Sequence, residues 1–274
     1  MMPDYLVIGA QKCATSSLCS LLGAHPEVFM TNPKEPFFFS HDEIWKRGMG
    51  WYQSLFERVT DEKAVGEGST TYSMYETYPD AARRIAENLP EVKLIYIVRD
   101  PLDRIVSHWV HLRSSGGREK LPFRDAVRTE PAYIDNSLYE KQIGIYLEHY
   151  PPDRIMTLFF EDFVRDQAAT MARCFDFLGV DTSLASPHTR HKHGSAGKRE
   201  DTRLLRPLRR FRFFEILRDR APHWLREPLR RALKRRAERP LFDAETRDWV
   251  AGRLREDSRA FLARSGKPTG FWGL

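Results

Sequence analysis

The fold is decided near the start of the chain, where residues 5–22 read YLVIGAQKCATSSLCSLL. The apolar run at residues 5–9 predicts a short buried strand. A loop of small residues follows, and the hydroxyl side chains at residues 15–17 are of the kind that caps a helix. The leucines that come next recur at helical spacing. The segment therefore predicts a strand, a tight loop and a helix.

Two later segments repeat this pattern. Residues 93–98 are apolar and β-branched, and the strand they predict ends at Arg99-Asp100-Pro101, where proline favours the first turn of a helix. A third strand is expected at residues 154–160, followed by an amphipathic helix at residues 163–178 that Gly179 closes. Strands that alternate with helices predict an α/β fold with a central parallel sheet flanked by helices.

The last third of the chain has a different composition. We expect a polar surface loop, because residues 183–202 contain almost no apolar side chains. Three helical stretches are expected beyond the loop, at residues 204–220, 224–238 and 244–265. The sequence thus predicts one domain, 1–274, made of an α/β core (1–182), the polar loop (183–202) and a helical C-terminal part (203–274).

Composition excludes several classes of protein. The 274 residues are 41% hydrophobic, which is enough for a sizeable core and excludes a wholly disordered chain. No run approaches the roughly 18 apolar residues of a membrane-spanning helix, and the first residues do not resemble a signal peptide, so we expect a cytoplasmic protein. Cys13, Cys19 and Cys174 have no metal-type spacing, and we expect neither a disulfide framework nor a metal site.

The positive charge is concentrated near the C-terminus. The net charge is +6, yet residues 198–239 alone carry 16 basic and 6 acidic side chains. Two interpretations of this Arg-rich segment are open. It can be a solvated helical surface, or it can bind a polyanion or an anionic membrane surface.

Two sites in the core have the properties of anion-binding sites. The loop at residues 9–17 presents backbone N–H groups at the start of a helix, and Lys12 adds a full positive charge. An ordinary loop with a surface lysine is the alternative. The second site is the strand end at Arg99, with Ser107 on the helix that follows; an arginine in a structural ion pair is the alternative there. Parallel sheets bind ligands at this edge.

The residues at both sites resemble a known family. Lys12-Cys13-Ala14-Thr15-Ser16 is similar to the 5′-phosphosulfate loop, K-x-G-T-[ST], of sulfotransferases that use 3′-phosphoadenylyl sulfate (PAPS). Residues 99–107, RDPLDRIVS, are similar to their R-D-P-x-x-R-x-x-S motif, whose first arginine and serine bind the 3′-phosphate. Residues 32–39, NPKEPFFF, resemble the K-E-x-x-F-F segment of the heparan sulfate sulfotransferase branch.

The resemblance implies a bacterial, PAPS-dependent sulfotransferase with the P-loop-like fold of that family. Such an enzyme moves a sulfuryl group to a hydroxyl or amine of a carbohydrate, a glycolipid or a small natural product, and it needs no metal. The chain departs from the pattern at Ala14, where the family usually has glycine, so Ala14 must adopt a negative φ or tolerate strain.

The resemblance also implies roles for individual residues. The expected catalytic residues are Lys12, which neutralises charge on the leaving phosphate, and Glu35, which acts as the base for the acceptor hydroxyl. We expect the phenylalanines at 37–39 to raise the pKa of Glu35 by desolvation. A surface glutamate paired with Lys34 is the alternative.

Nucleotide binding is expected from a larger set of side chains and backbone groups: Lys12, Cys13, Ala14, Thr15, Ser16, Ser17, Arg99, Ser107, Ser195, Lys198 and Arg199. The expected partners are PAPS, its product PAP and a hydroxyl-bearing acceptor such as a sugar or lipid, with no nucleic acid. Two other functions stay open, a P-loop small-molecule kinase and a non-enzymatic binding module built on the Arg-rich segment. The roles of Ser137, Tyr139, His41 and His108 also stay open.

Overall fold

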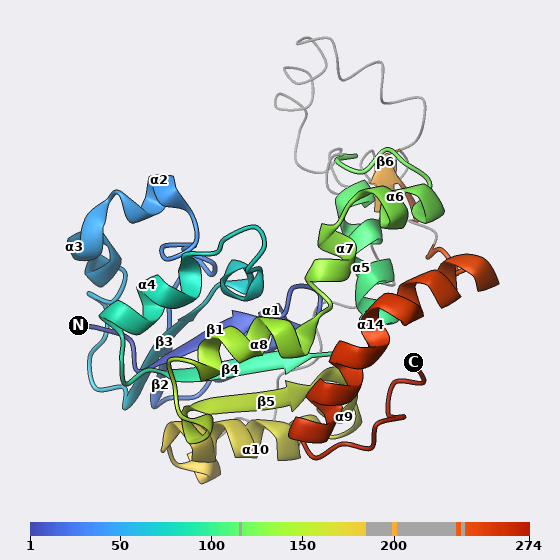
Figure 1. Cartoon of the computed structure of the whole chain (residues 1–274). Coiled ribbons are helices and arrows are strands. Elements are labelled where there is room, and N and C mark those ends of the chain that lie inside the picture. Colours follow the sequence, from blue (N-terminus) through green and yellow to red (C-terminus); the bar gives the residue numbers. More distant parts are fainter. Residues whose placement is uncertain (115–116, 185–198, 202–233, 237–238) are drawn as a thin grey trace.

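The structure is a computed structural model that describes residues 1–114, 117–184, 199–201, 234–236 and 239–274 (Figure 1). Its centre is a five-stranded parallel sheet in the order β2-β3-β1-β4-β5. The strands are β1 (Tyr5–Gly9), β2 (Val28–Met30), β3 (Ala64–Gly68), β4 (Lys93–Val98) and β5 (Ile155–Phe159). The predicted α/β fold is confirmed, and the three strands expected from the sequence are β1, β4 and β5.

Strands β2 and β3 were not predicted from the sequence. The residues of β3 are Ala-Val-Gly-Glu-Gly, and glycine and glutamate both disfavour strands when judged by local propensity. Gly66 is required by packing, because a Cβ atom there would lie 2.5 Å from the ring of Tyr5 on β1. The close approach of β1 and β3 thus explains why a glycine occurs in β3, although glycine by itself disfavours a strand.

Helices flank the sheet on both sides (Figure 1). The α-helices are α1 (Thr15–Leu22), α2 (Asp42–Trp45), α3 (Gly48–Ser54), α4 (Ala81–Asn88), α5 (Pro101–Ser114), α6 (Phe123–Thr129), α7 (Ala132–Asp135), α8 (Tyr139–Leu147), α9 (Phe160–Arg165), α10 (Gln167–Leu178) and α14 (Ala244–Arg264). Short 3-10 turns are η1 (Thr70–Ser73), η2 (Pro152–Arg154) and η3 (Thr182–Leu184). The helix predicted to begin at Pro101 is confirmed as α5.

The prediction of one continuous helix at residues 163–178 is wrong. The structure has two helices there, α9 and α10, separated at Asp166. The carboxylate of Asp166 accepts a hydrogen bond from the backbone N–H of Ala169, which makes Asp166 the N-cap of α10. The predicted end at Gly179 is confirmed, because Gly179 has a φ of +80°, which suits glycine.

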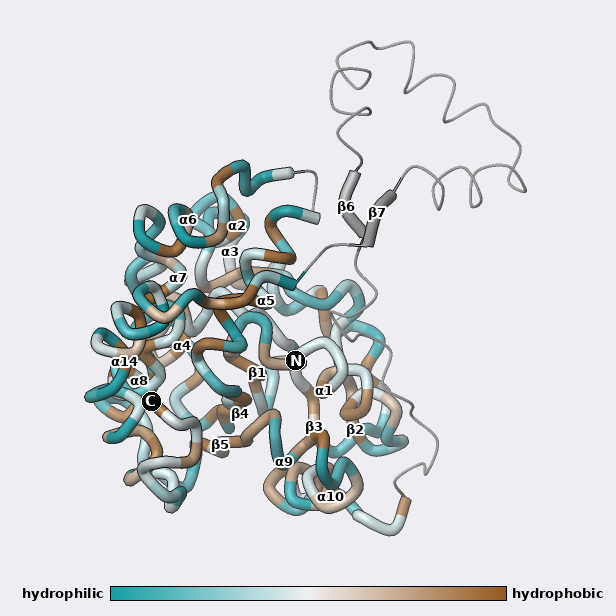
Figure 2. Tube along the Cα trace, turned by 90° about the vertical axis from the view of Figure 1, so that its right-hand side faces the viewer, coloured by the Kyte–Doolittle hydropathy of each residue, from teal (hydrophilic) through white to brown (hydrophobic). Residues whose placement is uncertain are grey.

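The described part of the C-terminal region adds a helix to the core. Helix α14 confirms the predicted stretch at 244–265 and packs against α8. Phe261, Leu262 and the later Trp272 belong to the same apolar core as the sheet. Figure 2 shows this core as brown segments along the strands, with hydrophilic segments outside. Within the described residues, no helix is both long and apolar enough to span a membrane.

A small antiparallel sheet lies where the sequence predicted part of a polar loop and part of a helix. It consists of β6 (Arg199–Asp201), which lies in the predicted polar loop, and β7 (Lys234–Arg236), which lies in the helix predicted at residues 224–238. The pairing joins segments more than thirty positions apart, so neither local composition nor periodicity indicates it. The helix predicted at 204–220 lies outside the described residues.

Candidate active site

Four loops meet where the parallel strands end. The loop after β1 carries Lys12, the segment after β4 begins with Arg99, the loop after β2 carries Glu35, and Thr70 follows β3. Since β2, β3, β1 and β4 are successive neighbours in the sheet, their carboxyl ends form one continuous edge. The structure therefore brings together the predicted catalytic residues and the two predicted anion sites.

The loop after β1 has an unusual backbone. Lys12 has a φ of +73° and Ala14 a φ of +69°, in the left-handed region that costs an L-residue roughly 1–2 kcal/mol. Ala14 is the residue before α1, and its carbonyl accepts hydrogen bonds from the N–H groups of Ser17 and Leu18. The strained conformation anticipated for Ala14 is thus present.

The predicted capping of α1 by a hydroxyl side chain is wrong. Ala14 occupies the N-cap position, and no side chain accepts a capping hydrogen bond there. Thr15 and Ser17 are buried, whereas Ser16 is exposed. The first N–H groups of a helix have no intrahelical partner, so the start of α1 offers donors to an anion together with these hydroxyls.

Arg99 lies at the end of β4 beside the same loop. The backbone N–H of Ala10 donates to the carbonyl of Ile97 over 2.7 Å, so the two predicted anion sites are adjacent in the sheet. The guanidinium of Arg99 is held by Asp103 Oδ2 at 2.7 Å and lies over the ring of Phe160 at 4.5 Å. Among the described residues, its buried Nε has no hydrogen-bond partner. Arg99 therefore has a fixed position, and the ion pair that was its alternative interpretation is present.

Ser107 lies on α5, two turns after the start of that helix, and is 8% exposed. Asp103, which holds Arg99, also forms an ion pair with Arg239 from the C-terminal region. Two guanidinium groups thus share one carboxylate near the predicted 3′-phosphate site. Of the remaining predicted nucleotide residues, Ser195 and Lys198 lie outside the described residues, and Arg199 is described only by its place in β6.

Glu35 is held by the segment that follows β3. Its backbone N–H donates to the carbonyl of Gly68 over 3.1 Å, and the hydroxyl of Thr70 donates to Oε1 over 2.9 Å. Lys34 Nζ forms an ion pair with the same oxygen at 2.9 Å. The Glu35 side chain is 31% exposed, so it stays accessible to a substrate while its position is fixed.

The expected rise in the pKa of Glu35 is wrong. Burial alone would raise this pKa, but the charge and hydrogen bond of Lys34 and the hydrogen bonds at Thr70 outweigh burial and lower it. Phe38 and Phe39 are fully buried and pack against Tyr52 in the core. The alternative of a Lys34–Glu35 pair is therefore present, within a site at the strand ends.

Neither His41 nor His108, whose roles the sequence left open, has a raised pKa. Desolvation lowers the pKa of His41, whose ring stacks on Tyr78 and whose Nε2 lies 3.2 Å from the Tyr78 hydroxyl. Burial and the neighbouring Arg104 and Lys12 lower the pKa of His108 to about 2. Both residues therefore stay neutral at neutral pH.

Glu67 is a buried carboxyl group that sequence analysis missed. Three hydroxyl groups surround its carboxylate, which accepts hydrogen bonds from Tyr72 at 2.5 Å, Ser69 at 2.9 Å and Tyr52 at 3.4 Å. Its exposed fraction is 0%, and burial raises its pKa to about 7. The sequence signal was its place in the segment GEGSTTY at residues 66–72, to whose glutamate no role was given.

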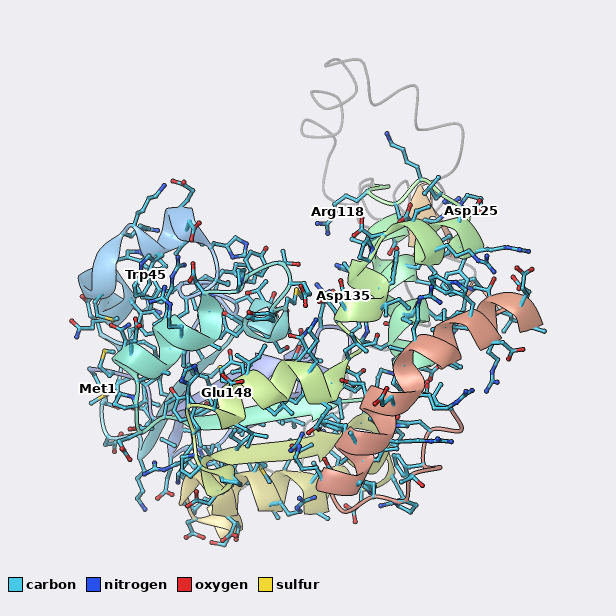
Figure 3. All side chains as sticks on the ribbon, in the orientation of Figure 1. Met1, Trp45, Arg118, Asp125, Asp135 and Glu148 are labelled. Atoms are coloured by element: carbon cyan, nitrogen blue, oxygen red, sulfur yellow. The ribbon has the colours of Figure 1, made fainter. Side chains whose placement is uncertain are left out.

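The two sides of the site come from different parts of the molecule. In Figure 3, Trp45 marks the part formed by α2–α4, and Arg118 and Asp135 mark the part formed by α5–α7. Glu35 precedes the first part in the chain, Arg99 precedes the second part, and Ser107 lies on its helix α5. Across the described residues, no three His, Cys, Asp or Glu side chains gather as they do around a metal ion.

Comparison with known proteins identifies similar chains. Residues 2–202 match the family model described as the sulfotransferase domain. The chain is 30% identical to human heparan sulfate glucosamine 3-O-sulfotransferase 6 over 193 residues, which cover 68% of this chain and 55% of that protein. It is 29% identical over 195 residues to mouse heparan sulfate glucosamine 3-O-sulfotransferase 3A1, covering 68% and 48%. The chain thus spans about half the length of these curated relatives.

Solved structures show the same fold. A sulfotransferase from Alicyclobacillus acidocaldarius is 24% identical and superposes with a TM-score of 0.72, covering 99% of both chains. The sulfotransferase domain from the curacin biosynthetic pathway is 18% identical, with a TM-score of 0.50 over 70% of this chain and 79% of that one.

Proposed function

Because this chain belongs to the sulfotransferase domain family, we propose that it transfers a sulfuryl group from PAPS to a hydroxyl or amine of a carbohydrate-like acceptor. The observation that carries the proposal is the adjacency of two anion sites at neighbouring strand ends, one at the Lys12 loop and one at Arg99. PAPS carries about four negative charges at the two ends of a nucleotide. The two sites suit those ends.

The residues of the chain fit distinct parts of the donor. Lys12 and the start of α1 offer positive charge and N–H donors to the 5′-phosphosulfate. Arg99, which Asp103 holds at the end of β4, and Ser107 on α5 are assigned to the 3′-phosphate. Like phosphoryl transfer, this reaction depends on positioning and on charge stabilisation rather than on covalent work by the protein.

The assigned chemistry is one in-line displacement. The acceptor oxygen forms a bond to sulfur while the bond between sulfur and the phosphate oxygen breaks, and Lys12 neutralises charge on that leaving oxygen. The acceptor proton passes to the carboxylate of Glu35. The lowered pKa keeps Glu35 ionised at neutral pH, so it is ready to accept the proton.

The proposed acceptor class rests on the relatives, because the similar human and mouse proteins are named as heparan sulfate glucosamine sulfotransferases. We propose a sugar hydroxyl or amine, free or attached to a lipid. The decisive assay incubates the chain with PAPS and a panel of glucosamine-containing oligosaccharides and glycolipids. Mass spectrometry then identifies products that gain one sulfuryl group.

Donor use is tested separately by calorimetry in the presence of a metal chelator. We expect PAP to bind without metal and more tightly than ATP, and to raise the melting temperature by mass action. Tighter binding of ATP, or a strict Mg²⁺ requirement for transfer, would favour the P-loop kinase and contradict the proposal.

A further inference from the structure

The hydroxyl of Tyr139 lies between the two segments assigned to the two ends of the nucleotide. Tyr139 is the first residue of α8 and has no exposed surface. Its hydroxyl donates to the carbonyl of Arg99 over 2.9 Å, and the same oxygen lies 3.8 Å from Cys13 Sγ in the loop after β1. One buried oxygen thus contacts both anion sites.

The Tyr139 side chain is held in one position. Its ring packs at right angles to Tyr96 of β4 and against Phe261 and Trp272 of the C-terminal region, with centroids 5.6–6.2 Å apart. Burial raises the pKa of Tyr139 well above its ordinary value, so the hydroxyl keeps its hydrogen and stays a donor.

The start of α8 is itself fixed to α5. Arg104 of α5 is fully buried, and its Nε donates to Ser137 Oγ over 2.6 Å. Its Nη2 donates to the carbonyl of Tyr133 over 2.7 Å. Arg104 therefore fixes the segment just before Tyr139 to α5, the helix that starts beside Arg99. Ser137, whose role the sequence left open, takes part in this structural contact.

We propose that Tyr139 is a positioning residue that sets the separation between the Lys12 loop and Arg99, so that both phosphate-bearing ends of a nucleotide bind at once. The proposal rests on the proposed function. A ligand that binds two sites together gains affinity only when their spacing matches its own length. A ligand with a single phosphate uses one site and is indifferent to that spacing.

The test compares Tyr139→Phe with the matched control Tyr150→Phe. Tyr150 is also buried, and its hydroxyl donates to the carbonyl of Leu89 over 2.8 Å, away from the strand ends. Calorimetry measures the affinity of each variant for PAP, adenosine 5′-phosphate and adenosine 3′-phosphate. Tyr139→Phe is expected to weaken PAP binding by about tenfold and each monophosphate by less than about twofold. Tyr150→Phe should leave all three unchanged.

Several outcomes would overturn this inference. Unchanged PAP affinity in Tyr139→Phe, or an equal loss for all three ligands, excludes a role in spacing. If Tyr139→Phe does not fold, Cys13→Ala removes the other contact of the hydroxyl, together with the contact between Cys13 Sγ and the carbonyl of Gln11, and unchanged PAP affinity there also overturns the inference. A wild-type chain that does not bind PAP overturns the proposed function and this inference with it, whereas the other outcomes leave the proposed function intact.

Discussion

The hydroxyl of Tyr72 donates a 2.5 Å hydrogen bond to Oε1 of Glu67, a carboxyl group with no exposed surface. Ser69 donates to the other oxygen of Glu67 and accepts a hydrogen bond from the backbone N–H of Phe37. This buried carboxyl group therefore supports, through Ser69, the loop that carries Glu35. Burial raises its pKa from 4.5 to about 7.

This raised pKa predicts that stability falls with rising pH. Between the unfolded value of 4.5 and the folded value of about 7, the folded chain binds the Glu67 proton more tightly than the unfolded chain does. The contribution is fully present below pH 4.5 and is lost as pH rises through about 7, a change on the order of 3 kcal/mol. Urea unfolding near pH 5 and near pH 8 measures it, and Glu67→Gln should lose this pH-dependent part.

The matched control is Glu57→Gln, because Glu57 is exposed on the surface. The control should keep the pH dependence of the wild type. Asp257, whose pKa burial raises to about 6, contributes a trend of the same sign, so the difference between wild type and Glu67→Gln is the relevant quantity. An equal pH dependence in wild type and Glu67→Gln would contradict the assignment.

Glu35→Gln keeps the shape of the side chain and removes the proton acceptor. Turnover should fall by about 10²–10⁴, while PAP affinity should change little, since Glu35 is assigned to the acceptor. Because the pKa of Glu35 is lowered, the wild-type rate should fall only as pH drops below 4.5, and the acid limb should disappear in the variant. Steady-state rates with PAPS across acidic and neutral pH check this. A defect mainly in PAP affinity would exclude Glu35 as the base.

The sequence predicted the parts of the fold that local patterns determine. The strand at residues 93–98 is a run of buried apolar side chains, and Pro101 begins the next helix as expected. The strand–loop–helix junctions that carry Lys12 and Arg99 were also predictable, because each is determined by a local pattern of residues.

The rest depended on contacts between distant segments. Strand β3 contains glycine where Tyr5 packs, and its Glu67 accepts a hydrogen bond from Tyr52, which lies fifteen positions earlier in the chain. The pKa of Glu35 was predicted with the wrong sign, because the charge and hydrogen bond of the adjacent Lys34, together with the hydrogen bonds at the distant Thr70, outweigh burial. Tyr139 likewise acquires its contacts with Arg99 and Cys13 only through the placement of α8.

Replacing Lys12 and replacing Arg99 should affect different quantities, turnover in the first case and PAP affinity in the second. Arg99→Ala should weaken PAP binding by about 10–100-fold, since a hydrogen bond to a charged group is worth roughly 1.5–3 kcal/mol. Lys12→Ala should lower turnover by about 10²–10³ with a smaller loss of PAP affinity, because its charge acts on the leaving oxygen. Calorimetry and saturating-substrate rates separate the effects. Arg165→Ala, which removes an exposed ion pair with Asp162, serves as the control and should change neither.

The backbone conformation of Ala14 predicts that glycine at this position stabilises the fold, whereas glycine inside a helix usually destabilises it. Ala14 has a φ of +69°, where glycine is free of the steric cost that an L-residue carries. Ala14→Gly should therefore raise the free energy of unfolding by up to about 1 kcal/mol while preserving PAP binding. Ala86→Gly, inside α4, should lower it by about 1 kcal/mol. Urea unfolding of both variants distinguishes the two backbone environments, and a comparable loss in both would show that Ala14 is unstrained.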